Sequence, residues 1–165
     1  IMREVPDAVL AIQGFGPEES AIRAAIDQFD LGDRVRLMGR FEPREAHEYA
    51  CGADVGVVIY ENTTLNNYLA SPNKLYAYLM AGVPVVASDS PGVREVISDG
   101  DVGALFDPSD ATSIATAIRT LLLDAPARKA MGARARQLAE ESLNWDVEKT
   151  RLAALYGELS QGPRA

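Results

Sequence analysis

Short apolar segments alternate with amphipathic segments along most of this 165-residue sequence. The apolar segments have the length of strands, and three of them are apolar at nearly every position, as expected for parallel strands covered on both faces. We predict strands over 8–14, 34–39, 54–60, 83–88 and 102–106. Segments with helical spacing lie between the first four of these strands, over 18–29, 43–51 and 72–81. This order predicts an α/β fold, a parallel, doubly wound sheet with right-handed crossovers.

The last third of the chain is predicted to be helical. Asp110 is a suitable N-cap for a helix over 111–123, and Pro126 suits the first turn of a helix over 127–142. Trp145 begins the last predicted helix, which ends near residue 159. Since no linker or repeat divides the chain, we expect a single domain over 1–165 that closes with C-terminal helices.

The composition describes an ordinary soluble globular protein, with 47% hydrophobic and 24% charged residues. A net charge of −8 argues against a nucleic-acid-binding surface, although it leaves room for a local anion site at a helix N-terminus. Cys51 is the only cysteine, which excludes a disulfide and fits the cytoplasm; we expect its side chain to be buried. His47, the only histidine, is interpreted as a surface or packing residue, and no metal site is expected.

Candidate ligand-binding residues follow the first two predicted strands, because doubly wound sheets bind ligands at the carboxyl ends of their strands. The first of these strand ends holds Gly14, Phe15 and Gly16. Its glycines allow a ligand to approach the backbone, and the alternative is an ordinary strand-to-helix turn. The spacing differs from the dinucleotide fingerprint, so NAD is not expected. The second strand end holds Gly39, Arg40 and Phe41, which could meet a flat base or could form an ordinary loop.

A third candidate is the start of the helix predicted over 72–81. Ser71 is a good N-cap and Pro72 a good first helical residue. The amides of this first turn, together with Lys74, predict a phosphate site.

The two faces of this predicted helix have different roles. Lys74 and Ala77 share one face, whereas Leu75 and Leu79 share a face suited to the core. We therefore expect position 77 to face whatever the helix N-terminus binds.

These segments together resemble the C-terminal, donor-binding domain of retaining glycosyltransferases of the GT-B fold, known as group 1 or family 4. The likeness covers nearly the whole chain and is carried by "VPDAVLAIQGFGPEESAIRAAI", "DRVRLMGRFEPREAHEYACGADVGVVIY" and above all "SPNKLYAYLMAGVPVVASDSPGVREVISDGDVGALFDPSD". The resemblance implies the Rossmann-like half of that fold. It also implies transfer of a sugar from a nucleotide diphosphate sugar, with retained anomeric configuration and without a metal or other cofactor.

By resemblance, the first glycine loop lies beside the donor, and the second loop reads the base with its backbone. The helix start that meets the diphosphate or the sugar corresponds to Ser71, Pro72, Asn73 and Lys74. The family commonly carries two glutamates eight positions apart on this segment, where this chain has Leu69 and Ala77. A subgroup with a "P-x-K-L-[FY]-E-Y" helix lacks the first glutamate, and this chain fits that subgroup except at position 77.

The resemblance also implies that the acceptor-binding domain, the first strand and helix of the donor domain, and a basic diphosphate clamp lie outside this sequence. The chain alone is then expected to be inactive, and a glycan or lipid-linked acceptor and peripheral membrane association would depend on the other domain. The family's strand order is 3-2-1-4-5-6, which leaves a gap between 8–13 and 55–59. We expect strand sliding, self-association or an outside segment to close it. The alternatives for function are a nucleotide-sugar epimerase and a degenerate interaction domain, the latter favoured by Ala77.

Overall fold

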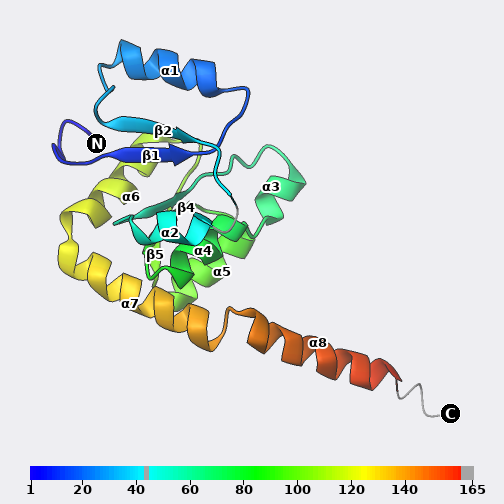
Figure 1. The fold of residues 1–165 in the computed structure, drawn as a ribbon. Coiled ribbons are helices and arrows are strands. Elements are labelled where there is room, and N and C mark those ends of the chain that lie inside the picture. Colours follow the sequence, from blue (N-terminus) through cyan, green and yellow to red (C-terminus); the bar gives the residue numbers. More distant parts are fainter. Residues whose placement is uncertain (43–44, 161–165) are drawn as a thin grey trace.

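The computed structural model describes residues 1–42 and 45–160 (Figure 1). The described part contains the strands β1 (Leu10–Gln13), β2 (Val35–Gly39), β3 (Gly56–Val58), β4 (Val85–Ser88) and β5 (Gly103–Phe106). Its helices are α1 (Glu19–Gln28), α2 (Ala46–Cys51), α3 (Leu65–Leu69), α4 (Asn73–Met80), α5 (Pro91–Gly100), α6 (Ala111–Leu123), α7 (Ala125–Glu141) and α8 (Trp145–Ser160). Every strand lies inside its predicted range, and the α/β class is confirmed.

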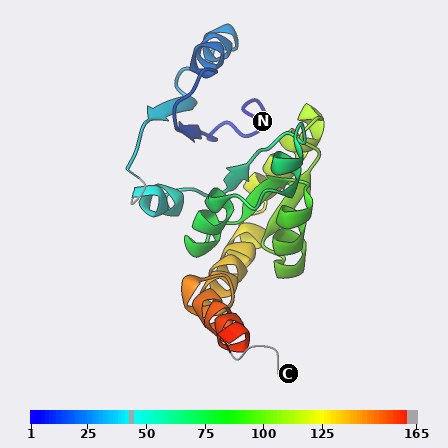
Figure 2. The same cartoon turned by 90° about the vertical axis from the view of Figure 1, so that its right-hand side faces the viewer.

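All strand pairs are parallel, but the strands form two sheets (Figures 1 and 2). One sheet contains β1 and β2, and the other has the order β3-β4-β5. The pairing of β1 with β2 is irregular between Ile12 and Gln13, so that Gln13 lies opposite Gly39. β1 and β3 are not paired, which confirms the predicted gap. Strand sliding, one of the three expected ways to close that gap, is not what the structure shows.

The second sheet is covered by helices on both faces, as a doubly wound fold requires. Val85 and Ala87 of β4 belong to a buried cluster with α4, α5 and α7. Val86, the residue between them, packs on the opposite face with Phe106 of β5 and Leu121 of α6. This alternation explains why the first three residues of β4 are apolar and why the whole strand is buried.

β1 is more exposed than its apolar sequence indicates. Val9 and Leu10 are 50% and 40% exposed, and α1 buries none of its residues completely. The physical reason is that β1 has a neighbouring strand on one side only. Its apolar sequence is that of an interior strand, whereas its surroundings are those of an edge.

The C-terminal helices are close to their predicted ranges. Asp110 caps α6 by accepting a hydrogen bond from the Thr112 amide. α7 starts two residues earlier than predicted, with Asp124 as its N-cap and Pro126 in its first turn. α8 extends away from the rest of the molecule (Figure 1), and none of its residues is buried.

Two helices were not predicted. α3 is a single short turn, and α5 begins at Pro91, within a Pro-Gly pair that resembles a loop. Val93 and Ile97, four residues apart on α5, are both buried, so tertiary packing supports this helix. The helix predicted over 43–51 is observed from Ala46; residues 43 and 44 of that prediction lie outside the described residues.

Candidate functional site

The first two predicted loops lie next to each other, because they follow two paired parallel strands. The Gly14 amide donates a hydrogen bond of 2.9 Å to the Gly39 carbonyl. Gly14 and Gly39 have φ angles of 146° and 71°, which favour glycine at both positions. Gly16 has no positive φ and no neighbour that an added Cβ would meet, so its backbone does not require glycine.

Side chains extend this contact between the two loops. The Arg40 guanidinium carbon lies 3.6 Å from the ring centroid of Phe15, and Phe15 is 65% exposed. A guanidinium stacked in this way keeps its N–H groups available at its rim. Phe41 turns instead toward α2, where its ring meets Tyr49 edge-on with centroids 6.2 Å apart. We call Phe15 and Arg40 the stacked pair.

The start of α4 differs from the prediction by one residue. Pro72, not Ser71, is the N-cap, because its backbone is extended with ψ at 138°, and Asn73 is the first helical residue. The Ser71 hydroxyl bonds the Tyr76 hydroxyl at 2.6 Å. The Leu75 amide donates to the Pro72 carbonyl, so the amides that precede it are at the open end of the helix.

The predicted core face of α4 is confirmed. Leu75 and Leu79 are completely buried, while Ala77 is half-buried and Lys74 is exposed. The Lys74 ammonium nitrogen lies 4.7 Å from the ring centroid of Tyr60, and desolvation of the ammonium group lowers the pKa of Lys74. We call Lys74 and Tyr60 the cationic pair.

The sequence analysis did not predict that Tyr60 and Ser88 belong to the site. Tyr60 follows β3, and its amide donates a 2.9 Å hydrogen bond to the hydroxyl of Ser88, which is buried at the end of β4. Ser88 ends β4 and Tyr60 comes two residues after β3 in the same sheet, so attention to the carboxyl ends of strands could have found both. Ser88, at the end of β4, therefore holds the backbone of Tyr60, whose ring contacts the Lys74 ammonium group.

α5 begins beside the start of α4. A Cβ added at Gly92 would come within 3.4 Å of the Ala70 carbonyl oxygen, so the two segments are in close contact. Asp89 lies 2.7 Å from the Arg94 guanidinium, and its hydrogen bond and charge raise the pKa of Arg94. The charge of Arg94 is thus balanced by a carboxylate, whereas Lys74 contacts an aromatic ring.

The stacked pair and the cationic pair lie at the same end of the two sheets. Figure 1 shows the arrowheads of β1 and β2 pointing to the side on which α3, the helix after β3, is found. α2, which holds the partner of Phe41, packs against α4. No hydrogen bond or ion pair among the described residues joins the two pairs directly. The structure therefore brings the first two predicted loops together and keeps the third as a neighbouring site.

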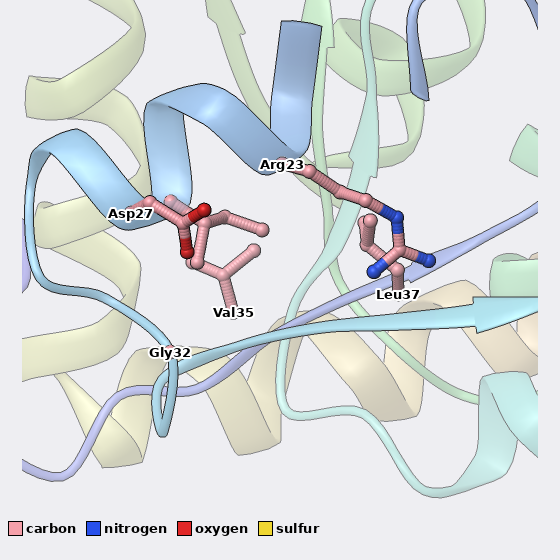
Figure 3. A pocket seen from close by; sticks show the side chains of 6 residues that line it. Arg23, Asp27, Gly32, Val35 and Leu37 are labelled. Carbon is pink, nitrogen blue, oxygen red and sulfur yellow. The ribbon is translucent and has the colours of Figure 1, made fainter. Parts of the chain in front are cut away.

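A hollow of about 280 Å³ lies elsewhere, between α1 and β2 (Figure 3). Its lining includes the apolar side chains of Ile26, Val35 and Leu37, with Arg23 and Asp27 at the side of α1. Arg23 is paired with Glu19 in the same helix at 2.7 Å. The hollow reflects the loose packing of α1 and contains none of the predicted site residues.

The interpretation of His47 as a surface residue is confirmed, whereas that of Cys51 is not. Both side chains are exposed, so the predicted burial of Cys51 is wrong. The two residues are one helical turn apart, and His47 Nε2 lies 3.5 Å from Cys51 Sγ, a contact that was not predicted from the sequence. Within 1–42 and 45–160, no cluster of three or more His, Cys, Asp or Glu could hold a metal ion. None of the described helices is both long and apolar enough to cross a membrane.

Comparisons with known proteins agree on one family. The family described as "Glycosyl transferases group 1" matches residues 1–138. A GDP-mannose-dependent alpha-(1-6)-phosphatidylinositol monomannoside mannosyltransferase of Mycolicibacterium smegmatis is 30% identical over 94% of this chain and 41% of its own length. An N-acetyl-alpha-D-glucosaminyl L-malate synthase of Bacillus anthracis is 28% identical over 94% of this chain and 39% of its own length.

Solved structures show the same architecture. A sucrose-phosphate synthase from Thermosynechococcus elongatus superposes with a TM-score of 0.79 and 25% identity, over 98% of this chain and 41% of that protein. Anabaena HepE in complex with UDP-glucose superposes with a TM-score of 0.77 and 18% identity, over 93% of this chain and 42% of that protein. The chain thus spans about two fifths of the length of these proteins.

Proposed function

Since this chain belongs to the group 1 glycosyl transferases, we propose that it is the part of a transferase that binds a nucleotide diphosphate sugar. The observation that carries the proposal is the open start of α4, with the Lys74 ammonium in its first turn and resting on Tyr60. This turn lies at the carboxyl end of the sheet, where the fold binds its ligands.

The chemistry of this turn suits a diphosphate. The first amides of α4 carry the positive end of the helix dipole, and a lysine beside them adds a full charge. In a chain of net charge −8, an anion needs such a local positive site. When the sugar is transferred, the same groups would stabilise the negative charge that develops on the departing diphosphate.

The neighbouring loops would hold the remainder of the donor. The backbone between Gly39 and Phe41 would meet the base, and Gly14, Phe15 and Gly16 would lie beside the sugar or the phosphates. The stacked pair presents a flat, cationic surface between these two loops. The mannosyltransferase of Mycolicibacterium smegmatis is GDP-mannose-dependent and HepE binds UDP-glucose, which supports a nucleotide sugar as the ligand class.

The whole protein would transfer the sugar with retention of anomeric configuration, without a metal or organic cofactor, and in the cytoplasm. The acceptor, a glycan or a lipid-linked molecule at the membrane surface, would bind to a second domain. The 41% coverage of the mannosyltransferase relative supports such a second part, and we propose that the 165-residue chain is inactive without it.

Nuclear magnetic resonance titration of the 165-residue chain with GDP and with UDP tests the proposal, because it detects dissociation constants of up to about 10 mM. We expect amide shifts at Gly14, Gly39, Tyr60 and Lys74. Lys74→Ala should weaken binding by about ten- to a hundred-fold, since a charged hydrogen bond contributes about 1.5–3 kcal/mol.

Lys149→Ala is the matched control, because Lys149 is an exposed lysine on α8. It removes the same charge and should leave the affinity unchanged. If neither nucleotide shifts the amides at the start of α4, the donor-site proposal fails. The alternative of a degenerate interaction domain, which Ala77 favours, would then be preferred.

A further inference from the structure

β5 is the outermost strand of the second sheet, so one of its edges is not paired with another strand of the described chain. On the paired edge, the Asp89 amide at the end of β4 donates a 2.9 Å hydrogen bond to the Phe106 carbonyl. Successive residues of a strand direct their backbone groups to opposite edges. The unpaired edge of β5 therefore presents the backbone N–H and C=O groups of Gly103 and Leu105.

A second hollow, of about 370 Å³, lies between this edge and α6. Its strand side is formed by Ala104 and Leu105. The Leu105 side chain packs on the opposite face of the sheet, against the cluster that contains α4, α5 and α7, so Leu105 lines the hollow with its backbone. The hollow therefore reaches the unpaired edge of β5.

The wall of the hollow formed by α6 is rich in hydroxyl groups. Thr112, Thr116 and Thr120 line it, and all three are exposed. Because they are four residues apart, they follow one side of the helix. We call these three residues the hydroxyl row.

Ser113, next to the hydroxyl row, already serves the edge of β5. Its hydroxyl accepts a 3.1 Å hydrogen bond from the Asp107 amide. Asp107 is two residues after Leu105, so its amide points to the same edge. A side chain of α6 thus takes the place of a neighbouring strand at the end of this edge, whereas the hollow lies beside the edge at Leu105.

Acidic residues lie at both ends of this edge. Asp99 and Asp101 precede β5, Asp107 and Asp110 follow it, and all four are exposed. Within 1–42 and 45–160, only Asp101 of these four belongs to an ion pair, with Arg134 at 2.9 Å. A ligand that extends along the edge therefore meets negative charge at both of its ends.

We propose that the unpaired edge of β5 and the hydroxyl row together bind an extended peptide with basic residues at its ends. The peptide would add a strand to the sheet, with its backbone bonded to Gly103 and Leu105. Its alternate side chains would point toward α6, where hydroxyls that both donate and accept hydrogen bonds suit small polar groups. The hydroxyl row is about 12 Å long, the length of about four residues of a strand.

A second copy of this chain fits the edge poorly. Two copies related by a twofold axis would pair their β5 strands antiparallel, with the start of one strand beside the end of the other. Asp99 and Asp101 of one copy would then approach Asp107 and Asp110 of the other, and like charges across strands are destabilising. A peptide with basic ends has the complementary charge.

Titration of the 165-residue chain with the synthetic peptide KTVTVTK tests the proposal. Its threonines can face α6 while its valines face the side of α5, and its residues favour extended structure. We expect amide shifts at Gly103 and Leu105 in nuclear magnetic resonance spectra. At a peptide concentration ten times the dissociation constant, exchange of the Leu105 amide should slow by about ten-fold. The Phe106 amide, which faces β4, is the internal reference.

Two control peptides separate charge from backbone pairing. ETVTVTE has the same central residues with acidic ends, and it should bind at least about ten-fold more weakly. KTPPVTK keeps the basic ends but lacks two consecutive amides, so the ladder is interrupted whichever edge of the peptide faces β5. We expect KTPPVTK to leave exchange of the Leu105 amide unchanged.

A protein variant tests the hollow itself. Thr116→Arg places a long cationic side chain in the hydroxyl row and should weaken KTVTVTK by about ten-fold or more. Thr150→Arg is the matched control, because Thr150 is an exposed threonine of α8, and it should leave the affinity unchanged.

Four results would overturn the proposal. The first is the absence of shifts at Gly103 and Leu105 with KTVTVTK at about 10 mM. The second is equal binding of the acidic or the proline-containing peptide, and the third is unchanged affinity in Thr116→Arg. The fourth is protection of the Leu105 amide that rises with protein concentration without peptide, because that would assign the edge to a second copy. None of these results depends on nucleotide binding, so this inference and the proposed function can fail separately.

Discussion

Gly132→Ala places a methyl group at the closest contact between α7 and the end of α4. Gly132 is buried on α7, on the same side as Ala135 and Ala139. A Cβ at position 132 would lie 2.4 Å from the carbonyl oxygen of Gly82. Contacts of this kind do not occur below about 3.0 Å, so the helix or the carbonyl must move by more than half an ångström.

The carbonyl has little freedom to move. Gly82 has a φ of 71°, its amide bonds the Leu79 carbonyl at 3.0 Å, and the next amide, of Val83, bonds the Tyr78 carbonyl at 3.0 Å. α7 must therefore move outward and loosen the packing of Ala135 and Ala139. Overpacking of this kind costs about 1–3 kcal/mol, and the better helix propensity of alanine returns up to about 1 kcal/mol.

We therefore expect Gly132→Ala to lower the free energy of unfolding by about 1–2 kcal/mol, and the midpoint of thermal unfolding by about 2–8 °C. Urea and thermal unfolding followed by circular dichroism measure both. Gly157→Ala on α8 is the control, because it makes the same change in a helix with nothing within 4 Å of the added Cβ. Wild-type or higher stability of Gly132→Ala would refute the reasoning.

Two further predictions concern polar contacts outside the site. The Asp124 carboxylate caps α7 by accepting a hydrogen bond of 2.9 Å from the Ala127 amide. Asp124→Ala should therefore lower the free energy of unfolding in urea by about 0.5–2 kcal/mol, and an unchanged midpoint would contradict this. The hydroxyl and amide of Ser109 donate hydrogen bonds to the Asp107 carboxylate and lower the pKa of Asp107 in the folded protein. These bonds therefore stabilise the fold above the pKa that Asp107 has in the unfolded chain, and the stabilisation is lost as the pH falls through its pKa in the folded protein. We expect Ser109→Ala to be less stable at pH 5 and to approach the wild type below the folded pKa, and a constant difference would exclude this linkage.

The strands and helices of the second sheet could be predicted well because their apolar positions match the faces that are buried. β4 is apolar at consecutive positions since helices cover both of its faces, and the spacing of Leu75 and Leu79 matches the buried face of α4. Asp110 could be assigned as a cap because its hydrogen bond is local.

Other features depend on contacts that a sequence pattern does not contain. α5 exists because Val93 and Ile97 pack on the core, although its Pro-Gly start resembles a loop. The cationic pair joins residues 14 positions apart, and the Tyr60 backbone is held by a hydrogen bond to Ser88, a residue of another strand. The apolar pattern of β1 is that of a covered strand, so this pattern did not predict the exposure of Val9 and Leu10.

The ribose side of the proposed site depends on Ala77. This residue is half-buried and follows Lys74 by three positions, so it shares the face of α4 that carries Lys74. A glutamate here could accept hydrogen bonds from both ribose hydroxyls, each contributing about 1.5–3 kcal/mol at best. We therefore expect Ala77→Glu to tighten binding of a nucleoside diphosphate by about ten-fold or more.

The new carboxylate would also lie within reach of Lys74, since residues three apart on a helix are neighbours. An ion pair with this carboxylate would compete with the phosphates for Lys74 and weaken the binding of every nucleotide by the same factor. The absolute affinity alone is therefore not decisive. The ratio of affinities for the ribonucleotide and its 2′,3′-dideoxy analogue isolates the ribose contribution, because both carry the same diphosphate. We expect titration to show that Ala77→Glu raises this ratio, whereas Ala154→Glu, on α8, leaves it unchanged. An equal ratio in the wild type and in Ala77→Glu would mean that position 77 does not face the ribose, even if Lys74 does bind the diphosphate.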